Sequence, residues 1–204
     1  MLPTYKLVYF DARGKAELSR LCFAAAGVKF EDERVTREEW PALKPAMPFG
    51  QLPVLDINGK LFGQSSAIEK YLAREFALYG KTSLEALEID EIIGLGRDYA
   101  DLVIAWYKES DETKKAQLGT KLLQENLPKF LKALESKLTN NVRGYLVGNQ
   151  MTLADLAIYD MLENNFRKTP ELLQNYPKVI GHRNRIASSQ KISTYLKNRK
   201  ETEF

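Results

Sequence analysis

The chain has 204 residues, of which 44% are hydrophobic and 28% are charged; this composition is typical of a globular protein with a well-formed core, and the length allows one large domain or two small ones. The 30 Lys and Arg residues exceed the 27 Asp and Glu residues by a net charge of only +3, which is too small to indicate a nucleic acid or a membrane surface as a partner. The single histidine, His182, excludes a His-rich metal site, and the single cysteine, Cys22, excludes an intrachain disulfide.

Basic residues accumulate between Lys178 and Lys200, where no acidic residue intervenes. A nucleic-acid surface would need aromatic side chains among the cations, and only Tyr195 is present, so we expect a solvated face. No apolar run reaches the roughly 18 to 20 residues of a membrane span, and residues 1–6 lack the basic and then apolar layout of a signal peptide. We therefore expect a cytoplasmic protein without a nucleic-acid or membrane partner.

The first 77 or so residues carry mixed strand and helix signals. Residues 5–10 are rich in aromatic and β-branched side chains and predict a strand, and residues 29–35 alternate and predict a second one. Between them, apolar side chains recur at helical spacing from Lys15 onward and predict a helix that stops at Gly27. Cys22 lies on the apolar side of this helix, so we expect a buried, inert thiol.

A hairpin and a further helix follow a loop that is rich in proline. Residues 52–57 and 60–62 flank Asn58-Gly59, the dipeptide most typical of a tight hairpin turn. Ser66 and Glu69 have the spacing of a capping box, which predicts that a helix opens there. The order of elements is thus β-α-β, followed by ββα.

Beyond residue 80 the chain has the pattern of helices. The polar break Gly80-Lys-Thr-Ser83 indicates a domain boundary. Apolar side chains at helical spacing over 92–106 predict a long helix, and a second spans about 111–138 with Pro128 as a kink or break. Thr152-Leu-Ala-Asp155 is a capping-box pattern that opens another helix.

Pro53 stands at the start of a predicted strand, where its missing N–H is not needed. A cis bond between Leu52 and Pro53 would turn the backbone groups of Leu52 outward beside the sheet, where they could pair with an extended peptide. Only about 5–6% of X–Pro bonds are cis, so the residues alone leave the isomer open.

Several motifs together carry a family resemblance. They are Tyr5-Lys-Leu-Val-Tyr-Phe10, Arg13-Gly-Lys-Ala-Glu17, Trp40-Pro-Ala-Leu-Lys-Pro45, Pro48-Phe-Gly-Gln-Leu-Pro-Val-Leu55, Gln64-Ser65 and Gly148-Asn-Gln-Met-Thr-Leu-Ala-Asp155. In this order and at this spacing, over essentially all 204 residues, the chain resembles the sigma-class cytosolic glutathione transferases. That group includes haematopoietic prostaglandin D synthase and the cephalopod S-crystallins.

The resemblance implies an α/β thioredoxin-like domain (β-α-β-α-β-β-α) over residues 1–79, a linker at 80–83 and an all-α helical-bundle domain over 84–204. It also implies a homodimeric enzyme that conjugates the thiolate of glutathione, its co-substrate, to small hydrophobic electrophiles for detoxification. Peroxidase or isomerase side activity is compatible with it, and no metal is implied.

The resemblance also assigns site residues. Tyr9 is the catalytic residue, whose hydroxyl donates to the glutathione sulfur. The resemblance assigns glutathione binding to Tyr9, Lys15, Trp40, Lys44, Gly50, Gln51, Leu52, Gln64, Ser65 and Asp98. It assigns the electrophile pocket to Arg13, Tyr99 and Trp106, with Leu102, Val103 and Phe204 as further candidates.

The resemblance also implies which part of glutathione each residue contacts. Trp40 and Lys44 would reach the glycine end of the tripeptide, Gln64 and Ser65 the γ-glutamyl carboxylate, and Asp98 the γ-glutamyl amine from the other subunit. Lys15 stands where relatives usually have Arg, so it keeps the charge but lacks the planar fork of donors.

Alternative functions within the same resemblance stay open. S-crystallins are usually rich in methionine and often carry an insertion among the helices after the linker. This chain has only four Met residues and no obvious insertion, which disfavours a non-enzymatic S-crystallin. A glutathione-dependent prostaglandin D synthase is compatible with Trp106, but Gly94 and Arg97 stand where those enzymes carry acids that bind a cation. A transferase-like interaction module is a third alternative.

Overall fold

The structure, a computed structural model, describes residues 3–202, which divide into two compact units. The first unit comprises residues 3–79 and 188–202, and the second comprises residues 80–187. Residues 188–202 thus group with the first unit, whereas the sequence predicts one helical domain over 84–204. That domain assignment stays a prediction.

The first unit is built on a four-stranded sheet with the strand order β2-β1-β3-β4. The strands are β1 (Tyr5–Phe10), β2 (Glu31–Val35), β3 (Val54–Ile57) and β4 (Lys60–Gly63). β1 runs parallel to β2 and antiparallel to β3, and β3 and β4 form the antiparallel hairpin predicted around Asn58-Gly59. The predicted strands are therefore confirmed. β2 and β3 are each two residues shorter than the predicted 29–35 and 52–57, and β4 is one residue longer than the predicted 60–62.

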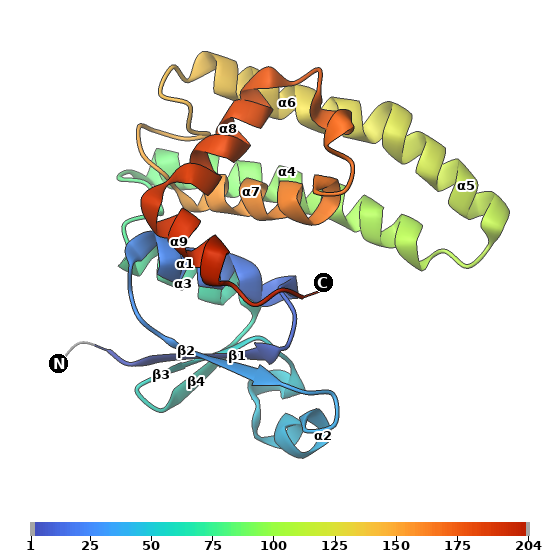
Figure 1. Ribbon diagram of the computed structural model, residues 1–204. Helices are drawn as coiled ribbons and strands as arrows, with labels where there is room; N and C mark the ends of the chain where they lie inside the picture. Colours follow the sequence, from blue (N-terminus) through green and yellow to red (C-terminus); the bar gives the residue numbers. More distant parts are fainter. Residues whose placement is uncertain (1–2, 203–204) are drawn as a thin grey trace. The chain divides into compact units, whose positions relative to one another are not determined.

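Helices cover this sheet (Figure 1). They are α1 (Glu17–Ala26), the short α2 (Trp40–Leu43) and α3 (Ser65–Glu75); a further helix, α9 (Gln190–Asn198), packs on α1. A 3₁₀ turn, Gly14–Ala16, precedes α1, and two more, Lys44–Ala46 and Pro48–Gly50, follow α2. α1 ends at Gly27, whose φ of 74° requires the left-handed region that glycine enters at little cost.

Alternation along β1 decides which side chains meet which helices. Tyr5 faces α1, where its ring lies 5.3 Å from that of Phe23. Val8 points to the other face and packs with Trp40 and Leu43 of α2. Tyr9 shares the face of Tyr5, so the strand period directs it toward the start of α1.

The second unit contains only helices among its described elements. They are α4 (Ser83–Lys108), α5 (Glu112–Lys121), α6 (Leu127–Asn140), α7 (Leu153–Phe166), a 3₁₀ turn (Pro170–Leu173) and α8 (Pro177–Ser188). α4 and α7 pack side by side (Figure 1). No helix within residues 3–202 is long and apolar enough to cross a membrane.

The second predicted long helix is interrupted, as Pro128 suggested. A π-helical turn, Leu122–Asn126, separates α5 from α6, and Pro128 is the second residue of α6. Proline has no N–H to donate and its ring collides with the carbonyl one turn earlier, so the helix has to rearrange before it.

One predicted capping box is confirmed and the other is wrong. At the start of α7, Thr152 and Asp155 make the reciprocal bonds of the motif. At the start of α3, the N-cap is Gln64 instead of a serine, and it makes no side-chain cap bond. The helix therefore opens at Ser65, and the spacing of Ser66 and Glu69 does not produce a capping box.

Asp155 also connects α7 to the rest of the unit. Its fully buried carboxylate accepts from the backbone N–H of Leu146 and Thr152, from Thr152 Oγ1 and from His182 Nε2, at 2.8 to 2.9 Å. The motif thereby joins α7, the segment before it and α8.

We expect Asp155→Ala to lower the free energy of unfolding by about 4 kcal/mol, because several buried donors lose their acceptor together. Urea unfolding measures this difference. The control is Asp111→Ala, which removes the exposed N-cap bond of α5 to Lys114 N (2.9 Å) and should cost only about 1 kcal/mol. Equal losses for the two variants would contradict the role given to Asp155.

Candidate active site

Tyr9 lies near the end of β1, with its phenol against the turn that precedes α1. The backbone N–H of Lys15 donates to Tyr9 Oη over 3.1 Å. Gly14 has a φ of +41°, and a Cβ at this position would lie 2.6 Å from Tyr9 Oη. Because the oxygen already accepts from Lys15, the phenolic proton remains available for another acceptor.

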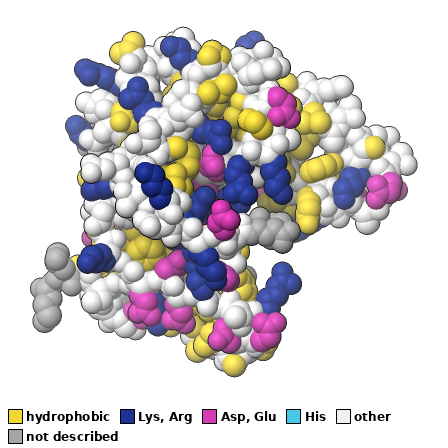
Figure 2. Space-filling model, viewed as in Figure 1, with side chains coloured by type: hydrophobic (Ala, Val, Ile, Leu, Met, Phe, Trp, Pro, Cys, Tyr) yellow, Lys and Arg dark blue, Asp and Glu magenta, His cyan; other side chains and the backbone are white. Residues whose placement is uncertain are grey.

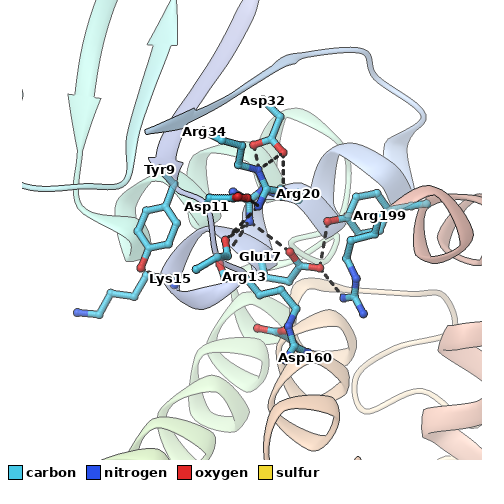
Figure 3. Close-up of polar contacts among 12 residues, drawn as sticks. Tyr9, Asp11, Arg13, Lys15, Glu17, Arg20, Asp32, Arg34, Asp160 and Arg199 are labelled. Atoms are coloured by element: carbon cyan, nitrogen blue, oxygen red, sulfur yellow. Dashed lines mark hydrogen bonds and ion pairs between the residues drawn. The ribbon is translucent and has the colours of Figure 1, made fainter. Parts of the chain in front are cut away.

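The loop between Tyr9 and this turn is held by a buried guanidinium (Figure 3). Arg20 is fully buried, and its Nη1 donates to the carbonyls of Ala12 (2.9 Å) and Arg13 (3.3 Å). The same nitrogen lies 3.3 Å from the Glu17 carboxylate, and Arg20 Nε donates to Asp32 over 3.0 Å. Arg20 therefore fixes the backbone on which the position of Tyr9 depends.

The C-terminal segment contributes to the same cluster. The fully buried carboxylate of Glu17 accepts from Arg199 Nη1 (2.7 Å) and from Tyr195 Oη (3.0 Å). Burial, followed by the charge of Glu17, raises the pKa of Tyr195 above its ordinary value. Residues far along the chain thus hold the start of α1 and, through it, the turn beside Tyr9.

An outer ion pair joins the same segment to the loop. Lys200 pairs with Asp11, and the Arg34 guanidinium lies 3.6 Å from the other oxygen of Asp11. The hydrogen bond from Lys200, followed by the charges of Lys200, Arg34 and Arg20, holds the pKa of Asp11 below its ordinary value. Both members of the Lys200–Asp11 pair are partly exposed.

The residues between 178 and 200 therefore do not form the uniformly solvated face that the sequence predicts. Arg183 pairs with Glu163, Arg199 with Glu17, and the side chains of both cations are mostly covered. On the face drawn in Figure 2, Lys and Arg side chains are scattered among acidic and apolar ones.

A cleft of about 860 Å³ opens beside Tyr9 in the first unit. It is lined by Tyr9, Phe10, Asp11, Ala12, Val35, Thr36, Arg37 and Trp40. The rings of Tyr9 and Phe10, and those of Phe10 and Trp40, are 5.6 Å apart and meet edge to face. Of these residues, sequence reasoning singled out only Tyr9 and Trp40.

The signal for the missed residues is the pairing of the strands. Phe10 is in register with Val35 in the parallel pair of β1 and β2. The carboxyl ends of parallel strands meet at one edge of a sheet, so Thr36 and Arg37 come beside Tyr9. Recognition of β1 and β2 as parallel neighbours would have predicted that Thr36 and Arg37 line the cleft.

Several predicted binding residues also gather in pairs. Gln64 Nε2 lies 3.4 Å from Gln51 Oε1, and the side chain of Lys44 lies against Gly50, about 3.5 Å from where a Cβ would be. The bond between Leu52 and Pro53 is cis. Their roles in binding stay predictions.

The start of α3 offers an environment for an anion. Ser65 is the first residue of this helix, and the first N–H groups of a helix have no intrahelical acceptor and lie at its positive end. Gln64 before it has a φ of +74°, a conformation that is rare without glycine and concentrates at functional sites.

The predicted electrophile residues are distributed over both units. Arg13 lies in the first unit, whereas Tyr99 and Trp106 are on α4 in the second. Tyr99 is buried, its ring is 4.8 Å from that of Phe130, and burial raises its pKa to about 12. Trp106 Nε1 lies 3.0 Å from the position of a Cβ on Gly119. The shared pocket stays a prediction, and Phe204 lies outside the described residues.

Cys22 is not among the residues that line the cleft beside Tyr9. Cys22 is fully buried, as expected, and burial raises the pKa of its thiol. Within residues 3–202, no group of three or more His, Cys, Asp or Glu side chains is arranged to hold a metal ion.

Comparison with known proteins supports the family resemblance in both the N-terminal and the C-terminal part of the chain. The family profile described as the glutathione S-transferase N-terminal domain matches residues 5–74, and that of the C-terminal domain matches residues 97–199. A probable glutathione S-transferase 6 of Caenorhabditis elegans is 38% identical over 98% of both chains.

Relatives with other names are almost as similar. S-crystallin SL11 of Nototodarus sloanii is 37% identical, and haematopoietic prostaglandin D synthase of Mus musculus is 36% identical, each over 100% of both chains. Among solved structures, a monomeric glutathione S-transferase of Necator americanus superimposes with a TM-score of 0.90 at 34% identity, over 98% of this chain and 100% of that one.

We expect Arg20→Met to lower the free energy of unfolding by about 3–5 kcal/mol, because Glu17 and two backbone carbonyls lose their buried donor. The control is Lys200→Gln, which breaks a partly exposed pair and should cost less than about 1 kcal/mol. Urea unfolding of both variants measures the difference, and a loss below about 1 kcal/mol for Arg20→Met would contradict the central position of this side chain.

The control has its own readout. Lys200→Gln should move the pKa of Asp11 up toward its ordinary value, as followed by carboxyl NMR. A lowered folded-state pKa stabilises the fold above the ordinary Asp value, and this contribution disappears as the pH falls through the folded-state pKa. The variant should therefore differ from the wild type near neutral pH and converge with it at low pH.

Proposed function

Because the chain belongs to the glutathione S-transferase family, we propose that it is a cytoplasmic sigma-type transferase in which Tyr9 activates the thiol of glutathione. The reaction is conjugation of the glutathione sulfur to small hydrophobic electrophiles, as in detoxification. The observation that carries this proposal is the phenol of Tyr9, which accepts from Lys15 N–H over 3.1 Å and so keeps its own proton for the sulfur.

The hydrogen bond from Tyr9 does part of the chemistry. A thiol with a pKa of ~8.5 is only about 3% ionised at neutral pH, and a hydrogen bond to a charged acceptor is worth about 1.5–3 kcal/mol. That energy lowers the thiol pKa by ~1 to 2 units, and a fall of two units increases the thiolate population roughly 25-fold.

The thiolate alone does not account for the rate. The nucleophilicity of sulfur falls with its pKa, with a slope of ~0.4–0.5 in thiol–disulfide exchange. If the same slope applies, roughly eightfold of the gain is lost and about threefold remains. Orientation of the electrophile against the sulfur has to supply the rest.

Glutathione itself is an extended, charged peptide, and the chain has suitable groups for each end. The start of α3 with Gln64 and Ser65 suits the γ-glutamyl carboxylate, because a helix N-terminus attracts anions. Trp40 and Lys44 suit the glycine carboxylate, while Gly50, Gln51 and the backbone of Leu52 suit the central residue. Lys15, whose backbone N–H contacts Tyr9, adds a positively charged side chain to this turn.

We place Asp98 with the γ-glutamyl amine of the partner subunit, which makes the proposed enzyme a homodimer. Large apolar side chains that face solvent in this chain support an interface: Phe49 is 76% exposed, and Leu84 and Leu87 on α4 are 64% and 65% exposed. The relative from Necator americanus is described as monomeric, so family membership does not by itself settle the assembly.

A non-enzymatic role, as for the S-crystallin relatives, is the second candidate. Turnover of a chlorinated dinitrobenzene with glutathione distinguishes the two, because a structural protein should show almost none. Prostaglandin isomerisation is a narrower version of the enzymatic proposal, and it depends on Trp106 and the pocket predicted around it.

We expect Tyr9→Phe to bind glutathione almost normally but to raise the pKa of the bound thiol by about 1–2 units, because the thiolate loses its donor. The ultraviolet absorbance of the thiolate against pH measures the shift. The control is Tyr5→Phe, on the same face of β1 but buried among rings of the core, where the thiol titration should not change. An unchanged titration in Tyr9→Phe would exclude the proposed role of Tyr9.

We expect Gly14→Ala to reduce the conjugation rate at least about tenfold while the protein stays folded, because the added Cβ displaces the Tyr9 hydroxyl from its position. Steady-state kinetics and circular dichroism measure the two effects. Gly59→Ala is the matched control, since its φ is +86° but nothing lies within 4 Å of a Cβ. Similar rates for the two variants would show that only backbone strain matters.

A further inference from the structure

The turn between β3 and β4 contains Asn58, the one asparagine of the sequence that is followed by glycine. Both turn residues have a positive φ, 53° at Asn58 and 86° at Gly59, as a two-residue hairpin turn requires. Both are exposed, and no described residue beyond its chain neighbours comes within 4 Å of a Cβ position on Gly59. The peptide group between the two residues therefore has open space around it.

An asparagine before glycine can modify itself with water as the only other reactant. The backbone nitrogen of the glycine forms a bond to Cγ of the asparagine, and the bond from Cγ to Nδ2 breaks. The proton lost from the glycine nitrogen ends on Nδ2, so ammonia leaves and a five-membered imide remains. One water then opens the imide to aspartate or to isoaspartate. Glycine favours ring closure because it has no side chain in the way and its backbone turns freely.

In the folded turn, the attacking nitrogen is held by a carboxylate. The backbone N–H of Gly59 donates to Asp56 Oδ1 over 2.6 Å. An amide nitrogen attacks only after it has lost its proton, and this loss would break the hydrogen bond and place a negative charge beside that of Asp56. Because like charges disfavour each other's ionised form, Asp56 keeps Gly59 in its unreactive, protonated state.

The side chain of Asn58 is held as well. The Thr4 N–H donates to Asn58 Oδ1 over 2.9 Å, and Thr4 Oγ1 lies 3.1 Å from the same oxygen. The Asn58 N–H donates in turn to the Thr4 carbonyl over 3.2 Å. This pair continues the antiparallel register of β1 and β3, in which Tyr5 is opposite Ile57. The carboxamide is thus tied to the residue before β1 instead of being free to turn toward Gly59.

The bonds that hold the two reacting groups are shallow barriers. Those of Gly59 and of the Asn58 carboxamide are exposed, so each competes with water and is worth a factor of only about 2 to 12 in an equilibrium. Several such bonds together slow the reaction strongly, but brief opening of the turn releases both groups.

We propose that Asn58 is a site of spontaneous deamidation, and that Asp56 and Thr4 hold its rate far below that of the unfolded chain. The modification then marks molecules in which the turn has opened. Aspartate at this position retains an acceptor for Thr4, whereas isoaspartate lengthens the main chain by one carbon and does not fit a two-residue turn. Asn58 lies beside the start of β1 and Tyr9 near its end, so the proposal is independent of the transferase function.

The test is incubation of the full chain at mildly alkaline pH, followed by proteolysis and mass spectrometry that separates asparagine, aspartate and isoaspartate at position 58. The same chain in concentrated guanidinium chloride is the unfolded reference. We expect both to be modified at Asn58, the folded chain at least about tenfold more slowly. The other asparagines, none of which precedes a glycine, should be modified more slowly than Asn58 in the unfolded chain.

Substitutions identify the protecting groups. Asp56→Ala should raise the rate in the folded chain about threefold to tenfold and leave the rate in denaturant almost unchanged. Asp56→Asn keeps an acceptor without the charge and should give an intermediate rate, while Thr4→Ala removes one donor and should give a smaller increase. Asp111→Ala is the matched control, because it also removes an exposed carboxylate that accepts from a backbone N–H, and it should not change the rate at Asn58.

Three results would overturn the proposal: no modification of Asn58 in either state, equal rates in the folded and unfolded chain, or no increase in Asp56→Ala. A slower reaction in Asp56→Ala would mean that the carboxylate removes the proton of Gly59 instead of retaining it. Circular dichroism shows whether the compared chains are equally folded, and none of these measurements depends on glutathione.

Discussion

The geometry beside Tyr9 depends on the buried ion pair between Glu17 and Arg20, whose side chains are both 0% exposed. Two charges without water are costly unless each finds further hydrogen bonds. Glu17 obtains them from Tyr195 and Arg199, and Arg20 obtains them from two loop carbonyls and Asp32. The pair thus ties the loop after β1 and the C-terminal segment to the start of α1, and movement of either segment would remove hydrogen bonds from a buried charge.

This rigidity matters for the proposed chemistry because a single hydrogen bond to sulfur would provide only a modest gain. In that proposal the phenol has to be in place before the thiol arrives, since reorganisation would consume the energy of the bond. Strand period brings Tyr9 to the correct face, Lys15 N–H orients its oxygen, and Gly14 leaves the room in which the ring lies. None of these three contributions requires a side chain other than that of Tyr9 itself.

Local patterns predicted the elements of this fold well and the long-range connections poorly. β1 and the capping box at Thr152 are determined by neighbouring residues, and both agree with the structure. The capping box at Ser66 failed because Gln64, with its positive φ, begins α3 earlier. The contact of Arg199 with Glu17 spans 182 residues, and no periodicity encodes it. The catalytic role proposed for Tyr9 came from family motifs, and this role and those of the binding residues remain predictions.

The choice between arginine and lysine follows burial. The paired arginines Arg20, Arg34, Arg183 and Arg199 have side-chain exposures of 0%, 17%, 23% and 14%. The paired lysines Lys6, Lys137 and Lys200 have exposures of 35%, 47% and 62%. A guanidinium is weakly hydrated and has several fixed donors, so it can satisfy more than one acceptor where water is absent, whereas an ammonium keeps its water. Within the basic stretch 178–200, the paired arginines Arg183 and Arg199 make mostly covered contacts, whereas Lys200 forms an exposed pair.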